Sequence, residues 1–229
     1  MVATTSSSSD RTEPALPVLD AIRVAIANGE FVPNQRLVEA DLSERFGASR
    51  ASVRTALVQL TSEGLVERVQ NRGARVRAVS LAEAVEITEV RMVLEGLCAA
   101  KAAQQLTDDD RDRLRAMGSA MRAAVATGDL LGYSELNTQL HALVRSLAGQ
   151  ATARSILERL RGQNVRHQFQ LAMHPGRPSV SLPQHLEIIE ALCAGDPEAA
   201  EAAMRRHLRS VIDTLPEVET SRTRRFSAL

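Results

Sequence analysis

The sequence from Leu81 to Thr214 repeats one amphipathic helical pattern, and this repetition limits the fold more than any other feature. Apolar residues recur there at three- and four-residue spacing, and Gly, Pro or capping residues separate the stretches. Six helices are predicted, at 81–105, 108–126, 129–147, 151–172, 183–194 and 197–214. Helices joined by short connections pack against their neighbours in antiparallel order. The pattern therefore predicts an antiparallel six-helix bundle.

The first 80 residues follow a different pattern. Three helices are predicted there, at 16–28, 39–46 and 49–63. Gly47 ends the second of these helices and Ser49 caps the third, so a turn of about three residues joins them into a helix-turn-helix. Two β-prone runs, 65–69 and 74–79, flank a loop that contains Gly73, which is typical of a hairpin wing. The expected fold is mainly α: an N-terminal winged helix-turn-helix followed by the bundle.

A chain of 229 residues suits two modest domains. We expect a flexible arm at 1–13, where apolar residues are few, and a winged helix-turn-helix domain at 14–79. An all-helical domain is expected at 80–215. The polar tail at 216–229 has no clear period, and no secondary structure is predicted for it.

The whole chain carries 28 basic and 28 acidic residues, so its net charge gives no argument for nucleic acid or membrane. It begins without a secretory signal, and no stretch is apolar enough to span a bilayer. We expect a soluble, cytoplasmic protein without a membrane partner. Cys98 and Cys193 lie in apolar helical patterns without CxxC spacing, which favours reduced, buried thiols over a disulfide.

Basic charge is concentrated between Arg45 and Arg77. This window contains seven arginines and two glutamates, which gives a net charge of 7 − 2 = +5. Such a density can neutralise phosphates and release counterions, which is usually the largest contribution to DNA affinity. Alternatively, the arginines only solvate exposed helix faces, as charge runs usually do. Their coincidence with a helix-turn-helix and a wing favours double-stranded DNA as the partner.

Individual DNA contacts can be predicted from position. Arg50 and Arg54 lie one turn apart at the start of the second helix of the motif, where side chains reach base edges and can bind guanine. We expect phosphate contacts from Arg45, Ser49 and Ser52. The wing tip, with Arg72 and Gly73, is expected to enter the minor groove.

The run GEFVPNQRLVEADLSERFGASRASVRTALVQLTSEGLV, followed by GARV, resembles the DNA-binding half of the GntR superfamily. This resemblance implies a homodimer that binds a short palindromic operator, with Arg50 and Arg54 at DNA-contacting positions and Gly73 at the wing tip. Members often carry Thr-Pro after the first arginine and Glu after the second. This chain has Ala51, Ser52 and Thr55 there, which alters the expected operator more than the fold.

Three of the five histidines, His141, His185 and His207, lie on apolar stripes of three different predicted helices, and His167 and His174 are interpreted as structural. Imidazoles that converge from three helices would suit zinc, nickel, cobalt or a similar divalent ion. Alternatively, each is a hydrogen-bonded core residue, which is the more common role of a single buried histidine. Asn137 precedes His141 by one turn and shares its face.

The helical half resembles the ligand-binding FCD domain of the FadR-like branch of GntR regulators, through the segments EVRMVLEGLCAA, NTQLH, QHLEIIEAL and MRRHL. The resemblance implies that His141, His185 and His207 are metal ligands for a divalent ion, zinc or nickel. Asn137 occupies the position where the family typically has aspartate. An amide oxygen is a neutral and weaker ligand than a carboxylate, but it can still coordinate.

Arg91 falls in register with the apolar residues Ile87, Leu94 and Cys98, where a guanidinium is costly to bury unless it is paired. It either pairs with Glu95 on the neighbouring turn or points into the bundle to bind an anion bidentately. The resemblance favours effector binding, because this arginine commonly faces the effector pocket in the family. A small organic, sugar or amino acid is the expected effector.

Together these features predict a bacterial transcription regulator, a repressor that associates with the nucleoid when bound to DNA. Effector binding would shift the dimer between DNA-competent and DNA-incompetent states. One alternative is a regulator that senses the metal itself. Another is a metal-dependent enzyme, because open coordination positions can activate water. The sequence offers no nucleophile motif or phosphate loop for such an enzyme, and the DNA-binding half would be unexplained, so no enzymatic activity is expected.

Overall fold

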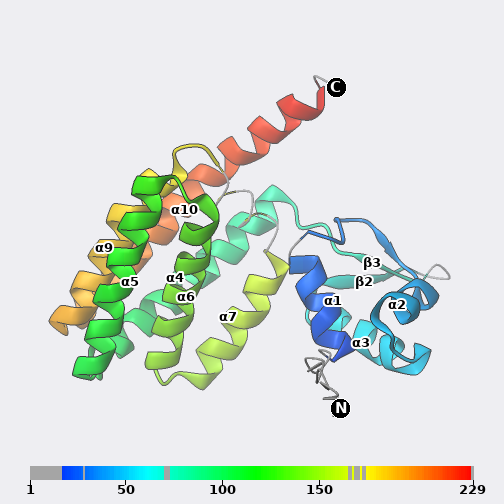
Figure 1. Ribbon diagram of the computed structural model, residues 1–229, viewed down its shortest axis with the longest axis horizontal. Coiled ribbons are helices and arrows are strands. Elements are labelled where there is room, and N and C mark those ends of the chain that lie inside the picture. Colours follow the sequence, from blue (N-terminus) through cyan, green and yellow to red (C-terminus); the bar gives the residue numbers. More distant parts are fainter. Residues whose placement is uncertain are drawn as a thin grey trace, which may run out of the picture. The chain divides into compact units, whose positions relative to one another are not determined.

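The computed structural model describes residues 17–227 apart from 28, 70–72, 165–166, 168–170 and 172–173. The chain divides into two compact units, Met1–Arg77 and Ala78–Leu229 (Figure 1). The predicted arm at 1–13 and Arg72 lie outside the described residues. Within the described part of the chain, no helix is both long enough and apolar enough to cross a membrane.

The first unit contains the expected helix-turn-helix. Its elements are α1 (Val18–Ala27), β1 (Arg36–Leu37), α2 (Glu39–Phe46), α3 (Arg50–Ser62), β2 (Val66–Val69) and β3 (Gly73–Val76). Helix α2 ends at Gly47, whose φ of 60° lies in the left-handed region that glycine tolerates. The Ser49 side chain caps α3 by accepting from the backbone N–H of Ser52. Both boundaries are those predicted from the sequence.

The wing differs from the prediction by one strand. β3 is the central strand of an antiparallel sheet and pairs with β2 and also with β1. β1 has two residues, too few to show an alternating pattern, and pairs with residues almost 40 positions later in the chain. In α1, Ile22 and Ala25 are buried, whereas the apolar Val24 between them is 45% exposed.

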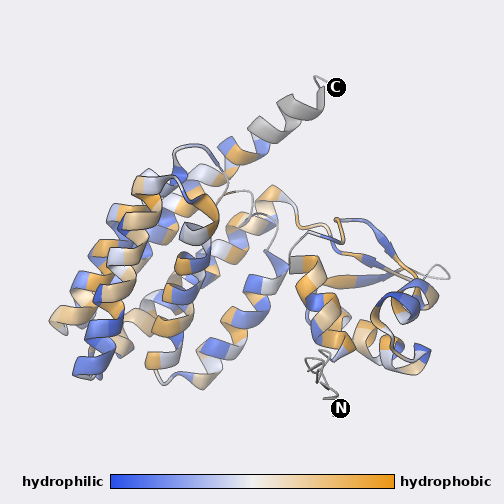
Figure 2. Cartoon of the chain, viewed as in Figure 1, coloured by the Kyte–Doolittle hydropathy of each residue, from blue (hydrophilic) through white to orange (hydrophobic). Residues whose placement is uncertain are grey.

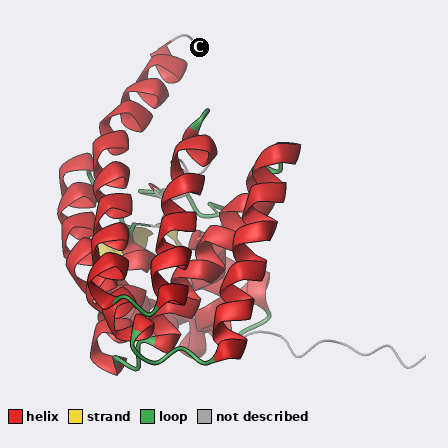
Figure 3. Ribbon diagram, turned by 90° about the vertical axis from the view of Figure 1, so that its left-hand side faces the viewer, coloured by secondary structure: helices red, strands yellow, loops and turns green. Residues whose placement is uncertain are grey.

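The second unit is all-helical in its described residues, which confirms the mainly α fold class. Its helices are α4 (Leu81–Ala103), α5 (Asp108–Thr127), α6 (Leu130–Leu147), α7 (Ala151–Gln163), α9 (Arg177–Ala194) and α10 (Pro197–Ser227). They lie side by side (Figure 3), and α4 packs against α6, α7, α9 and α10. Apolar and polar residues occupy different faces of these helices (Figure 2). The core includes Cys98, Leu114, Leu140, Ile188 and Met204.

Three helix boundaries differ from the prediction by more than two residues. α7 ends at Gln163 instead of residue 172. α9 begins at Arg177, six residues before the predicted start, with Pro178 in its first turn, where the missing N–H leaves no hydrogen bond unmade. α10 continues past Pro216 to Ser227, through the tail for which no structure was predicted. Leu215 and Val218 are buried on either side of Pro216, and their packing keeps the chain helical there.

Both cysteines are free thiols, as predicted. Cys98 is buried in the core, while Cys193 is only half-buried.

Candidate metal centre and effector cavity

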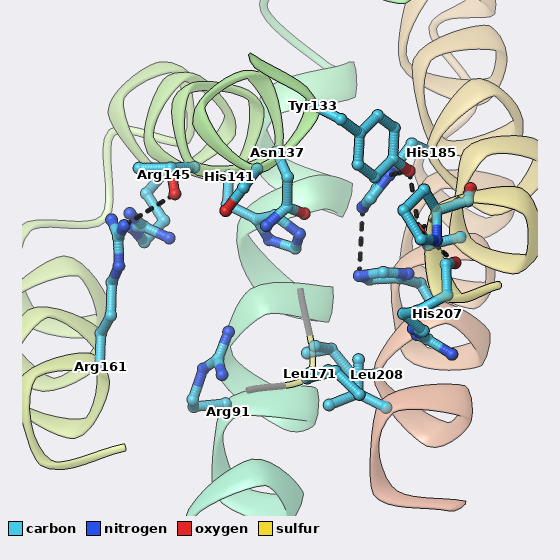
Figure 4. A pocket seen from close by; sticks show the side chains of 16 residues that line it. Arg91, Tyr133, Asn137, His141, Arg145, Arg161, Leu171, His185, His207 and Leu208 are labelled. Carbon is cyan, nitrogen blue, oxygen red and sulfur yellow. Dashed lines mark hydrogen bonds between the residues drawn. The ribbon is translucent and has the colours of Figure 1, made fainter. Parts of the chain in front are cut away.

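The three histidines on apolar stripes meet in the second unit (Figure 4). His141 projects from α6, His185 from α9 and His207 from α10, and all three are buried. One ring nitrogen from each lies within 4.8 Å of the others. The structure therefore brings together the three side chains that the sequence singled out as ligands. His167 and His174 lie apart from them and bond to the backbone carbonyls of Val79 and Pro175.

Each of the three rings is fixed through its Nδ1 atom. His141 Nδ1 lies 2.5 Å from Glu95 Oε2. His185 Nδ1 is 2.9 Å from the Tyr133 hydroxyl, and His207 Nδ1 is 3.0 Å from Gln184 Oε1. Partners of this kind set the tautomer and the orientation of a metal-binding histidine.

A chain of hydrogen-bonding contacts runs from the backbone carbonyl of Arg177 to the amide oxygen of Gln184. Ser181 Oγ lies 3.0 Å from the Arg177 carbonyl and 2.8 Å from the Tyr133 hydroxyl, which is 2.9 Å from His185 Nδ1. His185 Nε2 lies 3.3 Å from His207 Nε2, whose Nδ1 bonds to Gln184. With both rings neutral, these five contacts share four protons, so one of them lacks a proton.

The proton lies on Nδ1 in His207 and His141, because the partners of these two atoms can only accept. His207 Nδ1–H donates to the amide oxygen of Gln184, and His141 Nδ1–H donates to the Glu95 carboxylate. Burial, and then the neighbouring histidines, lower the pKa of His185 and of His207 well below the usual value, so both rings stay neutral at physiological pH.

The contact between His185 Nε2 and His207 Nε2, at 3.3 Å, is the longest of these five contacts. It is a hydrogen bond when His185 carries its proton on Nε2, and it places two lone pairs face to face when that proton is on Nδ1. Nitrogen ligands at 2.0–2.1 Å from a tetrahedral zinc ion are themselves separated by roughly 3.3–3.4 Å. The donor set therefore fits a divalent metal. Asn137 is half-buried, lines the same cavity beside His141, and provides an amide oxygen for a fourth contact (Figure 4).

Glu95 connects the histidine cluster to Arg91. Its Oε1 accepts from Arg91 Nε and Nη2 at 3.0 and 2.7 Å, which is the pairing that the sequence allowed. Burial opposes the charged form of Glu95, but Arg91, His141 and Arg145 outweigh this and hold its pKa far below the usual range. Arg91 also lines the cavity. It therefore pairs with Glu95 and also lies at the wall of the cavity in which it was predicted to bind an anion.

The cavity contains three arginines that sequence reasoning missed. Arg145, Arg161 and Arg177 line it together with Arg91 (Figure 4 labels the first two). Arg145 follows His141 by one turn of α6, a spacing that could have identified it. Arg177 fell in a segment treated as a loop. Leu171 and Leu208 provide apolar lining.

The residues predicted to contact DNA lie in the first unit, as follows. Arg50 is exposed at the first position of α3. Arg54 donates from Nη2 and Nε to Glu39 at 2.8 and 3.1 Å. Ser49 and Ser52 bond to each other through their hydroxyls at 2.8 Å. Arg45 pairs with Glu30.

A groove in this unit adds two arginines to the predicted set. Arg36 and Arg68 line it together with Arg54 and with Gly73, which has a φ of 86° at the start of β3. Arg36 also lies opposite Arg75 across β1 and β3, and Arg75 pairs with Glu67 on β2 at 2.6 Å.

Family models match almost the whole folded chain. The model of "Bacterial regulatory proteins, gntR family" matches residues 14–76, and that of the FCD domain matches residues 86–210. The HTH-type transcriptional repressor RspR of Escherichia coli is 28% identical over 206 residues, 90% of either chain. The HTH-type transcriptional regulator LutR of Bacillus subtilis is 28% identical over 212 residues, 83% of this chain and 95% of LutR.

Solved structures have the same fold. E. coli McbR/YncC superposes with a TM-score of 0.76 at 22% identity, over 87% of this chain and 95% of that one. A chain described as a transcriptional regulator GntR from Rhodococcus sp. RHA1 has a TM-score of 0.67 at 25% identity, over 87% and 96%. The chain belongs to the GntR family of DNA-binding transcription regulators and carries an FCD domain in its helical unit.

Proposed function

We propose that this protein is a repressor whose operator affinity is controlled by a small carboxylate bound beside a divalent metal in the FCD domain. The observation that carries the proposal is the convergence of three buried imidazoles: one ring nitrogen each of His141, His185 and His207 lies within 4.8 Å of the others. Imidazole nitrogens from three helices are a ligand set that suits zinc or nickel. RspR, similar along most of the chain, is named as a repressor, which supports the sign of regulation.

His141, His185 and His207 would hold the metal, zinc or nickel, and Asn137 would be the fourth protein ligand. The bound ion would act as a Lewis acid that attracts a carboxylate oxygen. Glu95, Tyr133 and Gln184 orient the rings through Nδ1. Because the ligand atoms are neutral, the charge of the ion would remain available to an anion.

DNA binding is proposed for the surface that presents Arg50 and Arg54 at the start of α3. GntR-family regulators usually act as dimers on DNA operators, and a homodimer would place two such helices on the halves of a palindromic operator. The bidentate contact of Glu39 holds the Arg54 guanidinium on the exposed surface of the unit. Arg36 and Arg68 would add phosphate contacts beside it.

Metal analysis of the purified full-length protein tests the centre. We expect about one zinc or nickel ion per chain, and loss of that ion in His185→Ala with the helical circular dichroism retained. His174→Ala is the matched control, because His174 lies outside the cluster. Unchanged metal content in His185→Ala would refute the assigned ligands.

Operator binding separates this proposal from direct metal sensing. The metal-loaded and metal-free proteins are titrated with an operator duplex selected from random DNA, with and without a carboxylate. We expect the metal alone to leave operator affinity unchanged and the carboxylate to weaken it only when the metal is present. A change of affinity caused by metal alone would support the sensing alternative instead.

A further inference from the structure

The cavity beside the histidine cluster contains more positive charge than one carboxylate can neutralise. Four arginines line it, and no carboxylate side chain does so among the described residues. Glu95, which lies behind the lining, pairs closely with Arg91, and Arg145 Nη1 is 3.9 Å from it. Across the residues that the structure describes, Glu95 is therefore the one buried acid that forms ion pairs with any of these four guanidinium groups. Buried charges of one sign require counter-charges from elsewhere.

The first incompletely compensated group consists of Arg145 and Arg161, on α6 and α7. Arg145 shares Glu95 with Arg91 at the longer distance of 3.9 Å. Arg161 Nη2 donates to the neutral hydroxyl of Thr138 at 3.0 Å. The charges of Glu95 and Glu135 also act on Arg161, but in the described part of the chain neither forms an ion pair with it. Burial, followed by the nearby charges of Arg145 and Arg91, lowers the pKa of Arg161. In Figure 4 these two arginines lie on the side of His141 away from His185 and His207.

The second group is Arg177 at the start of α9. Its side chain is 6% exposed, and its Nη1 donates to Ser210 and Thr214 on α10 at 2.8 and 3.1 Å. Its Nη2 is buried and has no hydrogen-bond partner among the described residues. A buried donor that lacks an acceptor is strongly unfavourable, so the acceptor is expected to come from a ligand in the cavity.

These two groups are held by different helices. Arg177 bonds to Ser210 and Thr214 on α10, whereas Arg161 bonds to Thr138 on α6. We propose that the effector is a short dicarboxylate, with one carboxylate bound by Arg177 and the other by Arg145 and Arg161; this inference rests on the proposed function. A monocarboxylate would leave one of the two groups without a counter-charge.

The size of the cavity limits the length of this dianion. The volume open to the centre of a water molecule is about 80 Å³. One water needs about 10–15 Å³ of such space, so the cavity has room for roughly five to eight water-sized groups. Malonate and succinate, with roughly seven and eight non-hydrogen atoms, fall in this range. A phosphorylated sugar is about twice as large and would require the helices to separate.

Calorimetric titration of the metal-loaded full-length protein tests the proposal. Succinate and butyrate have the same carbon chain and differ by one carboxylate, so they are compared at equal ionic strength. We expect succinate to bind at least about tenfold more tightly than butyrate, since a second charge-assisted contact is formed. Arg161→Gln should remove most of this difference. Arg159→Gln, on the exposed face of the same helix, should keep it.

Each further outcome has a distinct meaning. Equal affinity for succinate and butyrate, or failure of malonate, succinate and glutarate all to bind, would overturn the dicarboxylate assignment while the metal-loaded regulator stands. Failure of the protein to bind metal would refute the proposed function itself. Because Arg177 joins α9 to α10 and its variants can unfold, Arg161→Gln is the deciding variant, and its folding is checked by circular dichroism.

Discussion

Asn137 is the proposed fourth metal ligand, and replacing it with aspartate tests that role. The side chain is half-buried beside the histidine cluster and offers only a neutral amide oxygen. In Asn137→Asp a carboxylate would add charge attraction, so we expect metal affinity to rise about tenfold or more. Competition with a chromogenic chelator measures the change. Gln139→Glu, which adds a negative charge on the exposed face of α6, should have little effect; equal gains in both variants would contradict direct ligation.

Tyr133 tests the tautomer argument. Burial raises the pKa of Tyr133 to about 12, so the phenol is protonated at neutral pH, and its oxygen lies 2.9 Å from His185 Nδ1. When Nε2 of His185 binds the proposed metal, the Nδ1–H of the ring would donate to this oxygen. Tyr133→Phe removes this acceptor, and we expect metal affinity to fall by about 10- to 100-fold. The same chelator competition measures it, with circular dichroism as the check on folding. Unaltered affinity would mean that the hydroxyl does not set the tautomer of His185.

Arg54 tests base recognition on the DNA-binding surface. Its guanidinium is exposed, at the second turn of α3, and held by Glu39. Arg54→Ala should weaken binding to the selected operator roughly tenfold to a hundredfold if the side chain reads a base. Fluorescence anisotropy on operator and random duplexes measures the effect. The same loss on random DNA would reduce Arg54 to a phosphate contact.

Elements whose ends depend on local chemistry were predictable from the sequence, and elements that depend on distant partners were not. Gly47 and Ser49 fix the helix-turn-helix by themselves. β1, in contrast, exists because it pairs with β3, and α9 begins early because Arg177 bonds to α10. The same distinction between local sequence signals and distant partners applies to the candidate site. Helical spacing revealed the three histidines, but their Nδ1 partners come from elsewhere in the bundle and had no signal in sequence.

The part of α10 beyond Pro216 is expected to stabilise the fold through its packing. Val218 is 6% exposed and forms a small apolar cluster with Leu208, Val211 and Leu171, against which Met92 also packs. Val218→Ala removes two buried methyl groups, so the free energy of unfolding should fall by about 1–3 kcal/mol. Urea denaturation measures it, and the exposed Glu217→Ala is the control. A loss no larger than that of Glu217→Ala would mean that this part of α10 does not pack as described.

At the scale of the whole molecule, the proposed effector would have to influence the residues that join the two units. Only four residues, Arg77 to Ser80, connect β3 to α4. The carbonyl of Val79 among them accepts from His167 Nε2 at 3.0 Å. Leu171, four residues after His167 in the sequence, lines the cavity proposed for the effector. We propose that a ligand in contact with Leu171 acts on the connection through the bond between His167 and Val79.

His167→Ala should therefore uncouple the two activities without removing either. Metal content and carboxylate affinity are expected to stay the same, because His167 is not a metal ligand and does not line the cavity. Operator affinity without effector should also be retained. The factor by which effector weakens operator binding should fall toward one, and by reciprocity operator DNA should no longer weaken effector binding. His174→Ala, in the same segment, should keep both factors. Undiminished coupling in His167→Ala would show that the signal reaches the DNA-binding unit by another route.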